Sequence, residues 1–356
     1  MPNLVEQVIR PEILRLSPYH VPSSSGMIKL DAMENPYSLP EALQEEIAQL
    51  VTTISANRYP DSNSVSLKSS LRETMEIPMG MDIMLGNGSD EIIQIIASAL
   101  ARPGAVLMSV EPAFVMFRMI ATYTNMEYIG VPLKADFSLD LDLMLDAITK
   151  HQPAVIFIAY PNNPTGNSFD YGAIIEIIKS TSGMVVLDEA YYAYSDKSFL
   201  SEISNFPNLL VLRTISKIGF AGLRLGLLIG DQETIAQLNK LRLPYNINVL
   251  TQTSANFLLK DRQRILNNAQ IIIKERSRLT HELSLFPKFK VYPSQTNFIL
   301  VHSEDAHSLH SALKKNGILV KGFSKSSDLE NFIRISVSEP SENNSLIDAI
   351  RNYYGS

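Results

Sequence analysis

The sequence contains no cysteine among its 356 residues. A disulfide framework and a thiolate metal site are therefore excluded, and the chain is indifferent to the redox state of its compartment. No apolar run approaches the roughly 20 residues that a membrane-spanning helix needs. The first fifteen residues interleave charged side chains such as Glu6 and Arg10 with apolar ones, unlike a signal peptide. These absences predict a soluble, cytoplasmic protein without a membrane partner.

An excess of positive charge is also missing. The net charge is −6, the sequence pI is about 5.6, and lysine and arginine are scattered, which argues against a nucleic-acid partner. Of the six histidines, only His302, His307 and His310 lie near one another, and we expect them on a solvated helix face rather than around a metal. Asp188 and Glu189 are adjacent acids, but neighbours in a strand point to opposite faces, which disfavours hydrolysis by paired carboxylates.

Apolar sequence is plentiful, at 45% of residues against 19% charged, as in a globular protein. Continuous runs of Val, Ile and Leu at 154–160, 184–187 and 209–212 predict strands buried on both faces, as in a parallel sheet covered by helices. The length exceeds the usual size of one core, so a second, smaller domain is expected. We therefore predict an α/β fold, with a three-layer αβα large domain around a mostly parallel sheet and a smaller α+β domain.

The predicted domains follow from changes in pattern along the chain. Prolines and a Ser-Ser-Ser-Gly stretch preclude a long helix before residue 40, so residues 1–39 are an arm. The large domain is predicted at 40–245. The small domain is predicted at 246–356, opening with one long helical stretch at 251–286 before its strands begin near residue 297.

Candidate chemical groups stand where the predicted strands end, which is where ligands bind in parallel sheets. Lys217 follows one strand within the stretch from Thr214 to Gly226. An amine condenses with an aldehyde only when it is neutral, and a cation such as Arg224 would lower the lysine pKa. Taken alone, this stretch could equally be an exposed strand end with ordinary glycine turns.

A second stretch distinguishes these interpretations. Asp188 ends an apolar strand and Tyr191 follows three residues later. A buried Asp can hold a pyridine nitrogen protonated and a phenol can bond the 3-oxygen of the same ring, which are the partners that pyridoxal phosphate needs as an electron sink. Upstream, Gly86 and Gly88 precede a predicted helix whose N-terminus suits an anion. That signal is weak alone, and no third glycine completes a dinucleotide-binding fingerprint.

Asn-Pro-Thr-Gly at 163–166, Asp-Glu-Ala-Tyr at 188–191, and Ser-Lys followed by Ala-Gly-Leu-Arg-Leu-Gly at 216–226 occur in this order. With them the chain resembles the fold type I pyridoxal phosphate aminotransferases, nearly from end to end. Within that group it is most similar to the histidinol-phosphate aminotransferases. Five motifs carry this finer resemblance: Leu-Ser-Pro-Tyr, Leu-Asp-Ala-x-Glu-Asn-Pro, Arg-Tyr-Pro-Asp, Gly-Asn-Gly-Ser-Asp-Glu and Pro-Tyr-Asn-Ile-Asn.

The resemblance assigns expected roles to individual residues. Lys217 would be the Schiff-base lysine and proton carrier, Asp188 the partner of the pyridine nitrogen, and Tyr191 and Asn163 the partners of the 3-oxygen. The phosphate cradle would consist of Gly88, Ser89, Asp90, Ser216, Arg224 and, from the partner subunit of a homodimer, Tyr59. Phe114 would stack on the ring, and the substrate would contact Tyr19, Asn35, Lys321 and Arg334. No metal is implied.

The activity implied is transfer of the amino group of L-histidinol phosphate to 2-oxoglutarate, giving imidazole acetol phosphate and L-glutamate in histidine biosynthesis. The arm would join the small domain and the dimer interface. Three departures from the family pattern are Met33 in place of a frequent asparagine, Ser-Glu-Pro at 338–340, and a loop from Lys217 to Arg224 that is one residue shorter than in many relatives.

Three alternatives remain open from the sequence. One is an aminotransferase for aromatic or other amino acids. Another is a lyase similar to threonine-phosphate decarboxylase, which would use Lys217, Asp188 and an anion-binding arginine without needing a second oxo acid. The last is a cofactor-binding regulator without turnover, although the sequence has no added DNA-binding segment.

Overall fold

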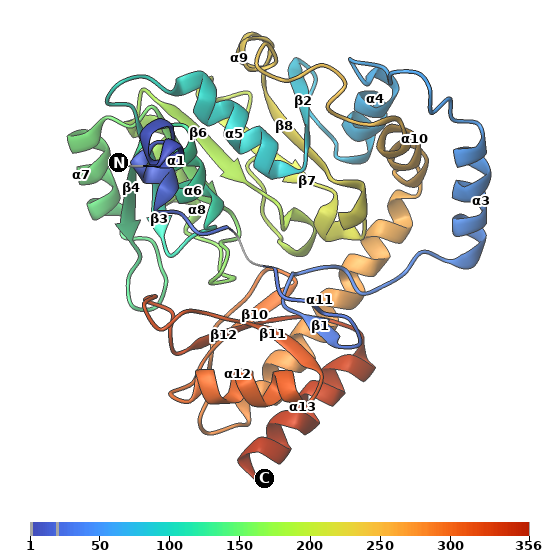
Figure 1. The fold of residues 1–356 in the computed structure, drawn as a ribbon, viewed down its shortest axis with the longest axis vertical. Helices are drawn as coiled ribbons and strands as arrows, with labels where there is room; N and C mark the ends of the chain where they lie inside the picture. The colour runs from blue at the N-terminus through green and yellow to red at the C-terminus, as the bar shows by residue number, and fades with distance from the viewer. Residues whose placement is uncertain (1–2, 19–20, 356) are drawn as a thin grey trace.

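The computed structural model describes residues 3–18 and 21–355, and two sheets organise them (Figure 1). The strands of the larger sheet are β2 (Met81–Asn87), β3 (Val106–Glu111), β4 (Glu127–Pro132), β5 (Val155–Ala159), β6 (Met184–Asp188), β7 (Leu209–Thr214) and β8 (Leu225–Asp231). Their order across the sheet is β2-β8-β7-β6-β5-β3-β4. The five strands from β7 to β4 run parallel, whereas β8 is antiparallel to both β7 and β2. The prediction of a mostly parallel sheet is confirmed.

Helices cover both faces of this sheet and produce the predicted αβα layers. One face packs against α4 (Val65–Thr74), α7 (Leu141–His151), α8 (Tyr171–Ser180) and α10 (Val249–Leu258). The other packs against α5 (Ser89–Leu100), α6 (Met116–Tyr123) and α9 (Gln232–Leu238). Strand side chains alternate between the two cores: Val186 and Leu212 lie on the α5 face, and Leu187 and Val211 lie on the opposite face.

The smaller sheet contains β1 (Ile28–Leu30), β9 (Lys290–Val291), β10 (Phe298–His302), β11 (Ile318–Gly322) and β12 (Phe332–Ser336), in the order β1-β11-β12-β10-β9. It packs with α11 (Arg262–Ser284), α12 (Ala306–Lys315) and α13 (Pro340–Tyr354) around a separate apolar cluster. β1 belongs to the arm and pairs with β11 in parallel, so residues from opposite ends of the chain share this sheet. In Figure 1 this unit lies below the larger sheet.

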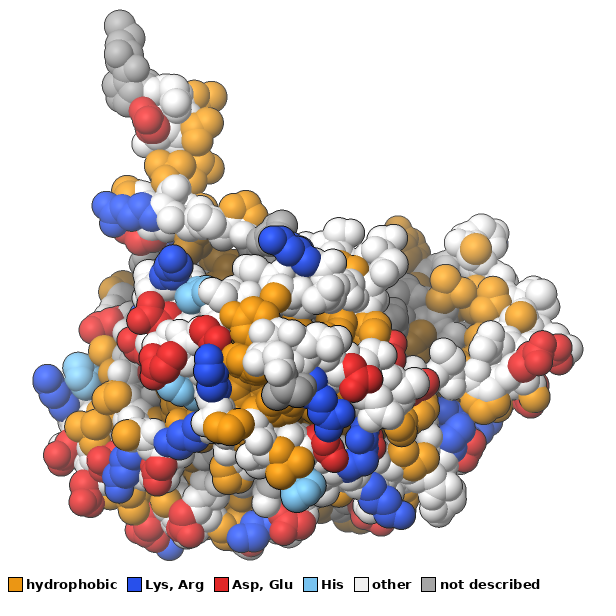
Figure 2. All heavy atoms as spheres, turned by 90° about the horizontal axis from the view of Figure 1, so that it is seen from below, with side chains coloured by type: hydrophobic (Ala, Val, Ile, Leu, Met, Phe, Trp, Pro, Cys, Tyr) orange, Lys and Arg blue, Asp and Glu red, His pale blue; other side chains and the backbone are white. Residues whose placement is uncertain are grey.

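The remaining elements include one helix of 12 residues, α3 (Glu41–Thr52). The others are short: α1 (Leu4–Val8), α2 (Pro11–Leu14) and the 3₁₀ helices η1 (Tyr192–Tyr194), η2 (Ser216–Ile218) and η3 (Ala221–Leu223). The N-terminal segment projects from the body of the molecule in Figure 2, and the apolar side chains of α1, including Leu4 and Val8, are exposed. None of the helices in the described part of the chain is long and apolar enough to cross a lipid bilayer.

The structure differs from the sequence prediction in two places. The long helical stretch expected at 251–286 is two helices, because Asp261 caps α11 through the N–H of Arg264 and so starts a new helix. β2 and β8, which form the antiparallel edge, were not predicted as strands. The predicted domain division at 246 stays a prediction. α10 packs on α3 and α4, and its residues Ala255 and Leu258 belong to a core of the larger sheet.

Candidate active site

A cavity lies at the carboxyl ends of β5, β6 and β7. Asp188 and Thr214 end β6 and β7 on the face covered by α5, two residues after Val186 and Leu212 of that core. The cavity is lined by Met33, Ser89, Asp90, Phe114, Ala159, Asn163, Asp188, Ala190, Tyr191, Thr214, Ser216, Lys217 and Arg224. Most of the residues expected to bind a cofactor therefore meet in one place, although they come from distant parts of the sequence.

One side of the cavity is an anion cradle built from a helix start and hydroxyl groups. α5 begins after Gly88 with no side-chain cap, and Ser89 and Asp90 of its first turn line the cavity, so this uncapped helix start lies at the cavity. Arg224 lies against this helix start: a Cβ placed on Gly88 would come within 2.5 Å of its Nη2. Nη1 of Arg224 is 3.5 Å from the hydroxyl of Ser216, which also bonds the hydroxyl of Thr214 at 2.9 Å. Helix dipole, guanidinium and hydroxyls together favour a phosphate.

Asp188 provides a buried acid next to this cradle. Its side chain is 5% exposed, and its carboxylate accepts the backbone N–H of Ala190 at 3.0 Å. Burial raises the pKa of Asp188 to about 7, and the nearby negative charge of Asp90 adds to the shift. Burial also raises the pKa of Asp90, whose Oδ1 has no hydrogen-bond partner among the described residues. A cationic ligand atom beside Asp188 would stabilise its ionised form.

Lys217 lies in η2, immediately after β7, and its Nζ donates to the carbonyl of Ala32 at 3.2 Å. Burial lowers the pKa of Lys217 to about 8, and the positive charges of Arg334 and Arg224 push it in the same direction. The neutral form of this amine, which nucleophilic attack on an aldehyde requires, is therefore far more populated near neutral pH than in an ordinary lysine.

Polar contacts connect this cavity to the smaller sheet. Asn163 donates through Nδ2 to the hydroxyl of Tyr191 at 3.2 Å and accepts Nη1 of Arg334 at 2.6 Å. Arg334 also donates to the carbonyl of Asp31 at 2.9 Å. Lys321 pairs with Arg334 across β11 and β12, and burial together with Arg334 lowers the pKa of Lys321. Two cations therefore lie side by side next to the cavity residue Asn163.

Among the described residues, five of those expected in the site do not line the cavity: Gly88, Lys321, Arg334, Tyr59 and Asn35. Tyr59 is 81% exposed and stacks on Tyr245 with a centroid distance of 4.4 Å, so its predicted role in a partner subunit stays a prediction. Asn35 lies beside Gly219, in the loop after the lysine, and lines a neighbouring hollow. Tyr19 lies outside the described residues.

The sequence prediction did not identify several residues around the cavity. Ala159 and Ala190 line it and Tyr194 donates its hydroxyl to the carbonyl of Lys217 at 2.5 Å, but small or aromatic residues after a strand carry no distinctive signal. Met33, which the sequence analysis named as a departure from the family pattern, lines the cavity with a φ of 53°, held by bonds from its N–H to Ser336 and from Asn297 to its carbonyl. Its left-handed backbone, unusual for methionine, is visible only in the structure.

The sequence of this chain is similar to those of known aminotransferases. The chain matches the family model described as aminotransferase class I and II over residues 25–350. A histidinol-phosphate aminotransferase of Vesicomyosocius okutanii subsp. Calyptogena okutanii is 47% identical over 352 residues, covering 99% of this chain and 99% of that protein. One from Chromobacterium violaceum is 45% identical over 351 residues, covering 98% of this chain and 99% of that protein.

A solved structure shows the same fold. It is the histidinol-phosphate aminotransferase from Sinorhizobium meliloti in complex with pyridoxal-5′-phosphate, which matches with a TM-score of 0.85. The match covers 96% of this chain and 97% of that chain, at 22% sequence identity. Because the two sequences are 22% identical, this match shows a shared fold and nothing further.

Proposed function

Because this chain belongs to the aminotransferase class I and II family, we propose that it transfers the amino group of L-histidinol phosphate to 2-oxoglutarate. The products are imidazole acetol phosphate and L-glutamate, and the reaction serves histidine biosynthesis. The relatives of that name, 47% and 45% identical over nearly their whole length, support this substrate. The structural observation that supports the chemistry is a single cavity holding a lysine of lowered pKa, a buried carboxylate and an anion cradle.

The residues around the cavity fit pyridoxal 5′-phosphate, the cofactor of this enzyme. The start of α5, Ser216 and Arg224 suit its phosphate, and a Cβ on Gly88 would fill that space. Asp188 is a buried acid whose ionised form needs a cationic partner, as a protonated ring nitrogen provides. When bound, the cofactor supplies an electron sink that makes a proton on the donor carbon removable.

The proposed roles of this chain's residues follow from their chemistry. Nζ of Lys217 would hold the cofactor in the resting enzyme, and as a free amine it would accept and return the donor proton as a general base and acid. Asp188 stays ionised against the ring nitrogen and holds it protonated. The hydroxyl of Tyr191 and the amide of Asn163, which bond each other, orient the ring oxygen. Phe114, which lines the cavity, would pack its ring against the cofactor.

Arg334 and Lys321 are proposed to hold the anionic end of both substrates. Histidinol phosphate carries a phosphate and glutamate a side-chain carboxylate, and the planar fork of Arg334 suits both anions. The contact between Arg334 and Asn163 places this cation next to the group that orients the ring. Asn35 and Tyr19 of the arm complete the proposed substrate site.

We further propose that the enzyme acts in the cytoplasm as a homodimer. The ring of Tyr59 supports this assembly, because it stays exposed to a partner subunit although it stacks on Tyr245. In the dimer, each phosphate would be held by groups from both chains. The arm is proposed to join the small domain to the dimer interface.

The experiment that tests the function separates the two half-reactions. Histidinol phosphate is added to the purified enzyme without an oxo acid, and absorbance is followed together with product analysis. We expect the pyridoxal form to convert to the pyridoxamine form with release of imidazole acetol phosphate, and 2-oxoglutarate to restore the original spectrum.

Three other outcomes would change or refute the assignment. Conversion by glutamate or an aromatic amino acid, but not by histidinol phosphate, would show an aminotransferase of another specificity. Release of carbon dioxide from a phosphorylated amino acid without any need for 2-oxoglutarate would show a decarboxylase. A spectrum that no amine changes would contradict catalysis altogether.

A further inference from the structure

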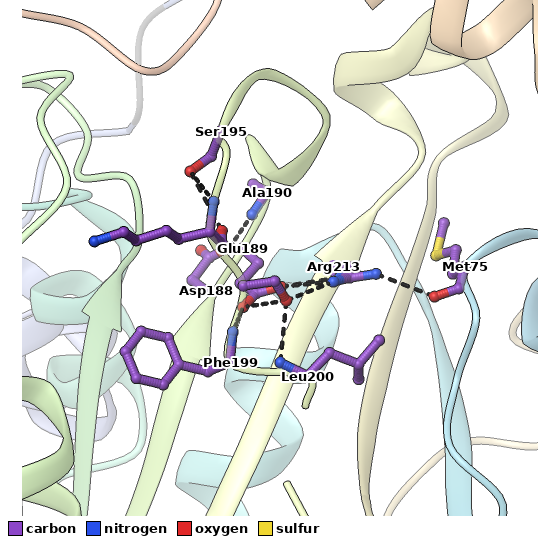
Figure 3. A network of polar contacts seen from close by, with 10 residues as sticks. Met75, Asp188, Glu189, Ala190, Ser195, Phe199, Leu200 and Arg213 are labelled. Atoms are coloured by element: carbon purple, nitrogen blue, oxygen red, sulfur yellow. Dashed lines mark hydrogen bonds and ion pairs between the residues drawn. The ribbon is translucent and has the colours of Figure 1, made fainter. Parts of the chain in front are cut away.

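Behind the cavity, on the opposite face of the sheet, lies a buried ion pair between Glu189 and Arg213 (Figure 3). Each partner is one residue away from a cavity residue: Glu189 follows Asp188 at the end of β6, and Arg213 precedes Thr214 at the end of β7. Because neighbouring strand residues point to opposite faces, the pair lies back to back with the cofactor site. The backbone N–H of Glu189 also bonds the carbonyl of Leu212, which ties the two strand ends together.

The pair is almost fully enclosed and its polar atoms are well satisfied. Glu189 is 0% and Arg213 is 5% exposed. Nε and Nη2 of Arg213 donate to Oε2 of Glu189 at 3.0 and 2.8 Å, and Nη1 donates to the carbonyl of Met75 at 3.4 Å. The guanidinium also lies 4.4 Å from the ring centroid of Tyr192. None of these groups lines the cofactor cavity.

Glu189 also closes a loop of the polypeptide. Its Oε1 accepts the backbone N–H of Phe199 at 2.6 Å, and the hydroxyl of Ser198 bonds both carboxylate oxygens at 3.0 and 2.8 Å. Arg213 donates to the same hydroxyl at 2.9 Å. The carboxylate therefore joins the first and last residues of the loop 189–199 and anchors both to β7.

This loop presents three residues to the site. Ala190 and Tyr191 line the cavity, and Tyr194 donates to the carbonyl of Lys217. Displacement of the loop would move the hydroxyl that orients the ring oxygen and the backbone that carries the lysine. Reaction geometry is sensitive to shifts of this kind, since a misplacement of about 1 Å can slow a reaction roughly a hundredfold.

We infer that Glu189 and Arg213 are positioning residues of the cofactor site, which hold the loop 189–199, and with it Tyr191 and the backbone of Lys217, in the reactive arrangement. A buried ion pair is weak evidence for a role in stability, because well-packed apolar residues often replace one without loss. The ion pair lies where the ends of β6 and β7 meet the loop 189–199, and this position favours a role in holding the loop over a role in stability. The inference rests on the proposed function and adds residues that touch neither substrate nor cofactor.

The test replaces both charges together. In the double variant Glu189→Leu with Arg213→Met, no unpaired charge is left in the core, so the protein is expected to fold. We expect its affinity for pyridoxal phosphate and its kcat to fall about ten- to a hundredfold, with KM for glutamate little changed. Hydrogen exchange of the full-length protein, with and without cofactor, should accelerate within the loop 189–199.

A control is the pair Glu275 and Arg278 of α11, whose side chains are 9% and 38% exposed and which bonds Asn343 of α13 instead of the site loop. Glu275→Leu with Arg278→Met should leave cofactor affinity and loop exchange unchanged. As a second probe, Glu189→Gln keeps an acceptor for Phe199 but removes the charge opposite Arg213, and it should also accelerate exchange in the loop.

The outcomes are distinct. If the double variant folds and keeps the cofactor affinity and the loop protection of the parent, the inference is overturned. The ion pair would then contribute only to packing. Equal losses in the double variant and the α11 control would also overturn it, because the effect would then be a general loss of stability. Failure of the unmodified enzyme to bind the cofactor would refute the proposed function, whereas loop exchange still measures positioning without it.

Discussion

Gly88→Ala is the perturbation that most directly tests the anion cradle. Gly88 has φ 84° and ψ 170°, a conformation that is essentially confined to glycine, and a Cβ there would lie 2.5 Å from Nη2 and 3.2 Å from Cζ of Arg224. The backbone strain should lower the free energy of unfolding by about 1–3 kcal/mol. The guanidinium must also move away from the helix start.

The loss of cofactor affinity can be estimated from the contact that is displaced. A hydrogen bond to a charged group contributes about 1.5–3 kcal/mol, so pyridoxal phosphate should bind roughly ten- to a hundredfold more weakly. Titration of the cofactor-free variant, followed by absorbance, measures this change. Arg224→Gln should produce a similar loss without altering the backbone at Gly88.

Gly80→Ala is the matched control. Gly80 also has a positive φ, of 89°, but a Cβ there would meet no atom within 4 Å. This variant should lose stability and keep its cofactor affinity. If Gly88→Ala also kept the parental affinity, the assignment of the phosphate to the start of α5 would be refuted.

Three further predictions concern the groups around the cofactor. Lys217→Ala should abolish amino transfer and leave the circular dichroism spectrum unchanged; residual turnover would exclude the lysine as proton carrier. Arg334→Ala should raise KM for histidinol phosphate and for glutamate alike, whereas an effect on one substrate alone would contradict a shared anion site. Because the pKa of Asp188 is raised from 3.8 to about 7, its ionisation opposes folding increasingly across that range, so the contribution of this group to the stability of the cofactor-free parent falls as pH rises. Asp188→Asn should therefore be more stable than the parent at about pH 8, and the gain should vanish near pH 4 in urea denaturation; a pH-independent difference would contradict the raised pKa.

Several local elements and most of the chemistry of the site could be predicted from the amino-acid sequence. Continuous apolar runs predict β5, β6 and β7 because strands buried on both faces cannot alternate with polar residues. Their ends carry Asn163, Asp188 and Lys217, and the rule that ligands bind at such ends predicts that these residues meet. The order of the motifs around them is specific enough to indicate the family.

The long-range contacts that complete the site could not be predicted from the sequence and are seen only in the folded chain. The antiparallel pair of β2 and β8 escaped prediction because its glycines resemble turn residues, although Gly226 is needed where the start of α5 lies against β8. The pairing of Lys321 with Arg334 depends on strand register, and the placement of Met33 depends on a sheet shared by both ends of the chain. The ion pair of Glu189 and Arg213 likewise forms only when β6 and β7 become neighbours. Periodicity and local motifs report on residues near in sequence, whereas pKa shifts and positioning arise from groups that folding alone brings together.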